Sequence, residues 1–184
     1  MKTIYYTAAS LDGFLADEAH GLDWLFQFGE AHDTGYHAFI KDVGALAMGA
    51  HTYEWLLRNH IKPGQPDAQP WPYEQPTWVF SRRQLPTLPG ANMHFVQGDV
   101  RPVHAAMAQA AGGKNIWLVG GGELAGCFLD AGLLDEILVT VASVTLGRGF
   151  PLLPRRQVAK PLQLLRVQQF GADFVQLNYR IQKG

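Results

Sequence analysis

Apolar positions recur along this chain with two periods, and the alternation of the two predicts how its elements follow one another. The β-branched and aromatic stretch from Thr3 to Ala9 predicts a strand, and Ser10 to Gly13 predicts the turn after it. A helical stripe, with apolar residues at i, i+3, i+4 and i+7, follows at Tyr36, Phe39, Ile40 and Val43. Short apolar runs between turn residues predict further strands over Ala45 to Met48, Thr77 to Phe80, Met93 to Val96, Ile116 to Val119 and Ile137 to Leu146.

Further helices and one long loop separate these strands. Helical spacing predicts helices over His51 to Arg58, between Arg101 and Gly112, and through Phe128 and Leu129. Repeated prolines between Asn59 and Gln75 predict a long irregular loop. Within this loop, Trp71 and Tyr73 either form part of a binding surface or pack onto the domain.

The end of the chain predicts a hairpin. Apolar and polar residues alternate from Val175 to Ile181, which is the pattern of a half-buried strand, and Gly171 to Asp173 predicts the turn before it. Strands alternate with helices for most of the chain and then stand alone. That order predicts an α/β fold with a mainly parallel central sheet and an antiparallel C-terminal hairpin at its edge. No shift in composition marks a boundary, so residues 1–184 are expected to form a single domain.

Composition narrows the classes of function. The formal net charge is -1 at pH 7, which argues against a nucleic acid or an anionic membrane as a partner. The single cysteine, Cys127, excludes an intrachain disulfide and is expected to be a small buried hydrophobe on a helix. No signal-peptide core or apolar membrane span is apparent, so a cytoplasmic protein is expected. The histidines form no His-Glu-x-x-His motif, and no metal is expected.

The strongest chemical signal is the run from Ile116 to Leu124, in which a buried strand passes through three glycines into a helix. Glycines allow positive φ angles and let a ligand approach the backbone closely. The free N–H groups and the dipole of a new helix attract an anion such as a pyrophosphate. The run does not match Gly-x-Gly-x-x-Gly, and a tight turn without a ligand is the alternative interpretation.

Two segments of the chain resemble the cofactor-binding segments of dihydrofolate reductases. Val119 to Gly122, followed by Phe128 and Leu129, is similar to their pyrophosphate-binding turn. Met48 to Glu54 resembles their Met-Gly-Arg-x-Thr-aromatic-Glu segment, with Ala50 in place of the arginine.

Other segments are closer to a sister family, the RibD C-terminal domain, which is the reductase domain of bacterial riboflavin-biosynthesis proteins. These segments are residues 10–13, 21–25, 130–136 and 146–152. The resemblance runs over nearly the whole chain and implies a dihydrofolate reductase-like, three-layer α/β/α fold. It also implies NADPH bound across the carboxyl ends of the central strands, where open α/β sheets generally bind ligands.

The resemblance implies a cofactor site with three parts. The first would hold the pyrophosphate from one side and consists of Val119, Gly120, Gly121, Gly122, Glu123 and Leu124. The second would hold it from the other side and consists of Gly49, His51 and Thr52. The third, Ser81, Arg82 and Arg83, would recognise the adenosine 2′-phosphate, because guanidinium groups form paired charge-assisted bonds with phosphates. A solvated arginine pair is the alternative. Ala125 stands where folate reductases usually carry an aromatic residue beside the nicotinamide.

Reduction of an imine or a carbonyl also needs a source of protons. Asp23 is the acidic candidate, because it lies in the region that borders the substrate in this superfamily; alternatively, it caps the helix that follows. Ser10 is expected to face the nicotinamide or the substrate. Asp12, Trp24 and Arg148 are further candidates for substrate contact, and turns at Asp12 and Arg148 are the alternative.

The expected function is therefore an NADPH-dependent reduction of a small heterocyclic or carbonyl compound, similar to a pterin, to dihydrofolate or to 5-amino-6-(5-phosphoribosylamino)uracil. The arginine-bearing segment with which riboflavin-pathway enzymes bind a ribose phosphate is absent after the second strand, and the acid of folate reductases has no clear counterpart. A nucleotide-binding protein with a degenerate site and no turnover is the alternative that Ala50 and Ala125 favour. A purely structural homodimer module is a third. The superfamily often forms dimers, so a homodimer is expected.

Overall fold

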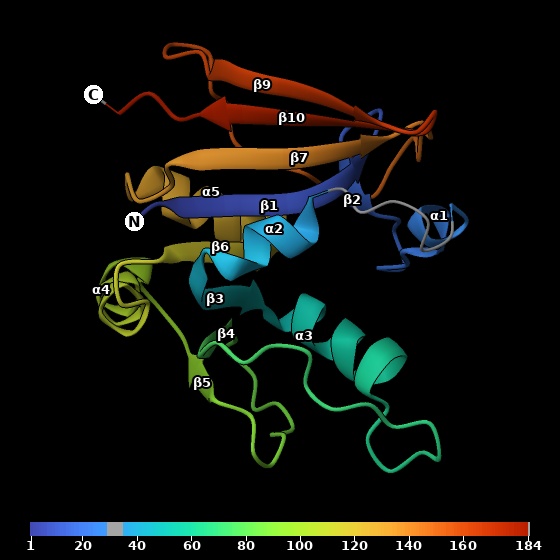
Figure 1. Cartoon of the computed structure of the whole chain (residues 1–184), viewed down its shortest axis with the longest axis vertical. Helices are drawn as coiled ribbons and strands as arrows, with labels where there is room; N and C mark the ends of the chain where they lie inside the picture. The colour runs from blue at the N-terminus through green and yellow to red at the C-terminus, as the bar shows by residue number, and fades with distance from the viewer. Residues whose placement is uncertain (29–34, 184) are drawn as a thin grey trace.

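A large mixed β-sheet forms the centre of the computed structural model, which describes residues 1–28 and 35–183 (Figure 1). Its eight strands are β1 (Thr3–Ser10), β3 (Val43–Gly49), β4 (Thr77–Phe80), β5 (Met93–Val96), β6 (Asn115–Gly120), β7 (Glu136–Ala142), β9 (Gln163–Phe170) and β10 (Phe174–Arg180). Their order across the sheet is β5-β4-β3-β6-β1-β7-β10-β9. The strands from β5 to β7 are parallel, whereas β10 pairs antiparallel with both β7 and β9. The predicted sheet and its C-terminal hairpin are confirmed.

Helices cover both faces of this sheet. They are α1 (Asp23–Phe26), α2 (Tyr36–Lys41), α3 (Ala50–Leu56), the π-helical turn η1 (Leu57–Ile61), α4 (Val100–Ala110) and α5 (Gly122–Asp130). In Figure 1, α2 lies in front of the sheet and α5 behind it. A short antiparallel pair, β2 (Phe14–Ala16) and β8 (Phe150–Pro151), forms a second, two-stranded sheet.

The period of two along the strands explains the three layers. On β1, the fully buried Tyr5 belongs to the same apolar cluster as Phe128 of α5 and Met107 of α4. Its neighbours Ile4 and Tyr6 point the other way, toward the cluster that contains apolar residues of α2. Because strands buried on both faces read as continuous apolar runs, the sequence pattern identified them without showing which face each residue takes.

Three element boundaries differ from those predicted. Val43 begins β3 instead of ending the helical stripe, because α2 ends at Lys41 and Val43 pairs with Asn115 of β6. The predicted helix after His51 continues to Ile61 as a π-helical turn, so Asn59 lies in a helix and not in the loop. Buried side chains of η1, Leu57 and Ile61, anchor that turn.

The strand predicted to reach Leu146 ends at Ala142. Beyond it, the carboxylate of Asp12 accepts hydrogen bonds from the backbone N–H groups of Leu146 and Gly147, at 3.0 and 2.7 Å. The partner strand β10 begins at Phe174, which pairs with Ala142, and the bonds to Asp12 tie the segment after Ser143 to the turn after β1, so the strand ends at Ala142.

The long loop and the cysteine also take definite positions. Trp71 and Tyr73 pack onto the domain, which favours the packing interpretation. The ring centroid of Trp71 is 6.0 Å from that of Tyr53, and the ring centroid of Tyr73 is 5.6 Å from that of Trp117.

Cys127 is exposed on α5, so its prediction as a buried residue was wrong: α5 turns Leu124, Ala125 and Phe128 to the sheet instead. In residues 1–28 and 35–183, no helix has the length and apolarity needed to cross a membrane.

Candidate active site

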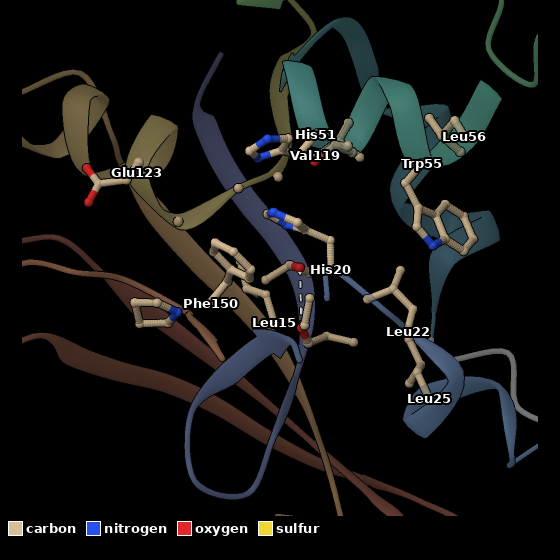
Figure 2. A pocket seen from close by; sticks show the side chains of 18 of the residues that line it. Leu15, His20, Leu22, Leu25, His51, Trp55, Leu56, Val119, Glu123 and Phe150 are labelled. Carbon is tan, nitrogen blue, oxygen red and sulfur yellow. Dashed lines mark hydrogen bonds between the residues drawn. The ribbon is translucent and has the colours of Figure 1, made fainter. Parts of the chain in front are cut away.

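A cavity of about 680 Å³ opens at the carboxyl ends of three neighbouring strands, β3, β6 and β1. Parallel α/β sheets bind ligands at this end, because the loops and helix starts that follow the strands meet there. Four separate parts of the chain line the cavity: residues 7–25, 51–56, 119–123 and 150–154. Figure 2 shows how side chains from these parts gather around it.

The glycine turn forms one side of this cavity. Gly120 ends β6, its peptide bond to Gly121 is cis, and Gly122 begins α5. Positive φ angles, which the sequence suggested for the turn, are absent from these three glycines: Gly121 has a φ of -95° and a ψ of -179°, which any residue adopts. The backbone angles of this turn do not require glycine. Glycines are needed because side chains would take up space that neighbouring atoms or a ligand occupy.

Each glycine lacks a side chain for its own reason. A Cβ on Gly122 would lie 2.3 Å from the carbonyl oxygen of Pro151, and a Cβ on Gly120 would lie 3.0 Å from Oγ1 of Thr52. A Cβ on Gly121 would meet no atom within 4 Å, because this glycine faces the cavity. Gly120 and Gly122 therefore allow close packing of the chain, whereas Gly121 leaves space for a ligand.

A carboxylate at the start of α5 is paired with a guanidinium group. Glu123 lies in the first turn, where its negative charge would repel an anion, but it forms an ion pair of 3.0 Å with Arg155. The same guanidinium donates to Asp130 at 2.7 Å, and these two carboxylates, Asp130 first, raise the pKa of Arg155 above its ordinary value. Arg155 reaches both because Gly126 has no side chain: a Cβ there would lie 2.6 Å from its Cζ. The pairing with Arg155 weakens the repulsion that Glu123 would exert on an anion at the positive end of the helix dipole.

A tight loop positions a histidine at the cavity. His20 has a φ of +62°, the left-handed conformation that costs a non-glycine residue about 1 kcal/mol or more. The carboxylate of Asp17 holds this loop, because it accepts hydrogen bonds from the N–H groups of Ala19 and Gly21 at 2.8 and 2.7 Å. The backbone N–H of His20 also donates to the carbonyl oxygen of Asp17.

The ring of His20 lies between two other rings of the cavity (Figure 2). It stacks on Phe150 with a centroid distance of 3.8 Å and an interplanar angle of 17°, and its centroid is 4.1 Å from that of His51. Burial lowers the pKa of His20, and the nearby His51 and Arg58 lower it further, against the weaker opposing effect of Asp17 and Glu54. Among the described residues that line the cavity, His20 and His51 are the two that carry an imidazole ring.

The other side of the cavity is apolar. Five residues, which we call the apolar wall, form it: Leu15, Leu22, Leu25, Trp55 and Leu56. In Figure 2, Trp55, Leu22 and Leu25 lie on the side opposite Glu123 and the start of α5. Phe26 of α1 supports the wall from behind, because its ring stacks on Trp55 at 5.6 Å with an interplanar angle of 9°.

The structure brings seven of the residues predicted for the cofactor to this cavity. They are His51, Thr52, Val119, Gly120, Gly121, Gly122 and Glu123. Gly49 is the N-cap residue of α3, directly before these residues, and Leu124 is buried beneath α5. Neither of these two lines the cavity.

The predicted 2′-phosphate residues lie outside the cavity lining. Ser81 Oγ accepts a hydrogen bond from the N–H of Arg83 at 2.9 Å. The guanidinium of Arg83 donates two bonds of 2.9 Å each to the carboxylate of Glu54, and these bonds hold the pKa of Glu54 below its usual value. Arg82 is exposed. One of the two guanidinium groups is therefore already paired within the chain.

Ser10 and Asp12, two of the predicted catalytic and substrate residues, form hydrogen bonds that hold a turn together. Ser10 is buried, and its hydroxyl donates to Asp12 at 2.6 Å and accepts from the N–H of Phe14 at 3.0 Å. The bond from Ser10 and the bonds from Leu146 and Gly147 lower the pKa of Asp12. Ser10 and Asp12 therefore tie the turn after β1 to the segment after β7, and neither lines the cavity.

The remaining candidates also lie outside the lining. Asp23 is exposed at the first position of α1, and it does not cap this helix: the N-cap residue is Leu22, without a side-chain cap bond. Trp24 follows Asp23 and is half-buried. The side chain of Arg148 is 79% exposed and lies 4.0 Å from Glu18, as the turn interpretation expects.

Sequence reasoning missed several cavity residues, namely His20, Phe150, Trp55 and the leucines of the apolar wall. Phe150 lies in a segment that carried the family resemblance, so its position could have been inferred from that segment. His20 stands in a loop whose shape depends on side-chain bonds from Asp17, for which residue spacing gives no signal. In the described part of the chain, no group of three or more potential metal ligands gathers.

Comparisons with known proteins agree with this geometry. Residues 1–176 match the family described as the RibD C-terminal domain. The chain is 34% identical over 178 residues to the uncharacterized protein YwjB of Bacillus subtilis strain 168, and the match covers 97% of each chain. A second uncharacterized protein of that organism, YyaP, is 26% identical over 182 residues, which are 97% of this chain and 94% of the relative.

Solved structures show the same fold. A protein from Shewanella sp. PV-4, provisionally assigned to riboflavin biosynthesis, superposes with a TM-score of 0.82 at 27% identity, over 99% of this chain and all of that one. Dihydrofolate reductase from Enterococcus faecalis, solved as a complex with NADP(H) and RAB-propyl, gives a TM-score of 0.62 at 14% identity, over 98% of this chain and 97% of the other. These structures confirm the predicted dihydrofolate reductase-like α/β fold.

Proposed function

The chain belongs to the RibD C-terminal domain family, a family of reductases, and from this membership we propose that it is an NADPH-dependent reductase of a small heterocyclic or carbonyl compound. One observation carries the proposal: the glycine turn faces a large cavity with the start of α5 beside it. The choice of NADPH is supported by the resemblance of the glycine turn and of Met48 to Glu54 to folate reductases. It is also supported by the NADP(H) present in the Enterococcus faecalis enzyme.

The residues present fit a pyrophosphate. Gly121 leaves the space that a bound group would need, and the first N–H groups of α5 have no acceptor within the helix. Thr52, whose hydroxyl lies beside Gly120, would supply a further donor from α3. Arg155 pairs with Glu123 and with Asp130, which weakens the repulsion of an anion by Glu123 at the helix start.

The bound cofactor would supply a hydride, and the chain's own residues would place the substrate and supply a proton. His20 and His51 lie together in the cavity, so we assign the proton-holding role to this pair. Asp23, the acid suggested by the sequence, lies outside the lining and is replaced in the proposal by the two imidazoles. The rings of His20 and Phe150 and the apolar wall would border the reacting groups.

A two-step experiment tests the proposal. NADPH is first titrated against the intrinsic tryptophan fluorescence of the full chain, and NADPH oxidation is then followed with a panel of pterins, pyrimidines and quinones. Saturable binding followed by turnover of at least one compound is the expected result. Binding without turnover supports the alternative, a nucleotide-binding protein without catalysis, and absence of NADPH binding refutes the proposal.

A further inference from the structure

The apolar wall gives the substrate half of the cavity a definite chemical character. Its members come from β2, from α1 and the residue before it, and from α3, so three separate elements contribute apolar side chains to one surface. The glycine turn and α5 form the opposite side (Figure 2). If the cofactor is held at α5, the wall is what remains for the molecule to be reduced.

Trp55 contributes a planar indole ring to this surface. Its indole ring lies nearly parallel to the ring of Phe26, with a centroid distance of 5.6 Å and an interplanar angle of 9°. Aromatic rings prefer offset-stacked partners, and burial of one ring removes a large apolar area from water. A flat ligand would gain both contributions against Trp55.

Charge is scarce around the wall. Among the described lining residues, Glu123 is the one with a carboxylate, and no lysine or arginine is present. Glu123 is paired with Arg155, and its side chain is 76% exposed. Arg58, whose charge acts on His20 from outside the lining, and Arg148 are both exposed, and residues 29–34 contain neither lysine nor arginine.

An anionic substrate would therefore be buried here without a cationic partner. Transfer of an unpaired carboxylate or phosphate from water to an apolar surface costs several kcal/mol. The N–H groups of His20 and His51 and the hydroxyl of Thr7 instead suit a neutral oxygen or nitrogen atom.

We propose that the substrate is an uncharged, flat and mostly apolar carbonyl compound, which lies against the apolar wall with its oxygen directed toward His20 and His51. This inference rests on the proposed reductase function. The carbonyl carbon gains a hydride from NADPH, which becomes NADP⁺, and the π bond of the carbonyl breaks. The oxygen gains a proton from the N–H of one imidazole of the pair, the other nitrogen of that ring takes a proton from water, and the product is an alcohol.

A matched pair of probes tests the charge of the ligand. 2-Naphthaldehyde and 2-naphthoate share one ring system, but only the second carries a charge. Their binding to the full chain is measured by calorimetry at pH 8, without cofactor and with NADP⁺, which cannot reduce the aldehyde. We expect the aldehyde to bind at least about tenfold more tightly than the carboxylate. Equal or tighter binding of 2-naphthoate would overturn the proposal.

Variants of the wall test the location. Leu22→Arg places a cation at the rim of the wall and is expected to reverse the preference in favour of 2-naphthoate. Leu11→Arg is the matched control, because Leu11 is 67% exposed and outside the lining, and it should bind both probes as the unmodified chain does. Circular dichroism checks folding, and Leu25→Arg replaces Leu22→Arg if the latter does not fold. Identical behaviour of wall and control variants would refute the assignment.

The measurements separate this inference from the proposed function. If the aldehyde binds at the wall but NADPH does not bind, the reductase proposal fails and the ligand class stands. If NADPH binds and the aldehyde does not, the ligand class fails and the reductase proposal stands. Oxidation of NADPH by 2-naphthaldehyde, with 2-naphthalenemethanol as product, would support both.

Discussion

Replacement of Gly121 by valine separates cofactor binding from folding. Gly121 has an extended backbone that valine adopts readily, and a Cβ there meets no atom within 4 Å. The protein should therefore fold normally, with a melting temperature within about 2 °C of the unmodified value. The valine side chain would instead occupy the part of the cavity where we place the pyrophosphate.

The size of the effect follows from the bonds that would be lost. Hydrogen bonds to a charged group contribute about 1.5–3 kcal/mol each. Displacement of the pyrophosphate from two N–H groups at the start of α5 would thus cost about 3–6 kcal/mol. This corresponds to a dissociation constant for NADPH that is higher by a factor of about 10² to 10⁴.

Fluorescence titration with NADPH and a thermal melt are measured on the same samples. Gly121→Ala should give a smaller loss of affinity than Gly121→Val. Ala159→Val, which adds bulk at an exposed position outside the cavity, should change neither quantity. An unchanged affinity in Gly121→Val would show that the pyrophosphate does not lie at this turn, and loss of folding would refute the packing argument.

Three further predictions concern neighbouring positions. Gly122→Ala should lower the free energy of unfolding in urea by roughly 1–3 kcal/mol, because its Cβ would lie 2.3 Å from the carbonyl oxygen of Pro151; an unchanged value would contradict the geometry. Because the pKa of His20 is lowered in the folded state, the unfolded chain binds more protons at acid pH, so the free energy of unfolding should fall as pH decreases below about 6.5. His20→Asn should make this decrease smaller, as urea titrations at pH 7.5 and pH 5 would show. Glu54→Gln frees Arg83 from its ion pair and should raise the preference for NADPH over NADH by up to about fivefold; an unchanged ratio of dissociation constants would exclude Arg83 from recognition of the 2′-phosphate.

The order of elements could be predicted because each strand and helix carries its own period of apolar residues. Met93 to Val96 and Thr77 to Phe80 have the predicted bounds. The errors lie where a contact distant in sequence decides a boundary. The segment after β7 is held by hydrogen bonds that its N–H groups donate to Asp12, which precedes it by more than a hundred residues, and no local pattern contains that information.

The candidate site was predictable in part for the same reason. The glycine turn is local in sequence, so Gly120 to Gly122 were found, and the structure places them at the cavity. Asp23 is predicted as the acid because it lies in the region that borders the substrate in the superfamily, and such a resemblance does not specify where a side chain points. His20 reaches the cavity through a left-handed turn held by Asp17, and such a turn has no signature in residue spacing. The homodimer remains a prediction.

The cavity has a lining drawn from four distant parts of the chain, so it exists only in the completely folded protein. Any molecule that fills it must therefore favour the folded over the unfolded population. A ligand at 100 times its dissociation constant adds about 2.7 kcal/mol to the free energy of unfolding. Since proteases attack the open chain, the abundance of this protein in a cell should rise and fall with the supply of its ligands.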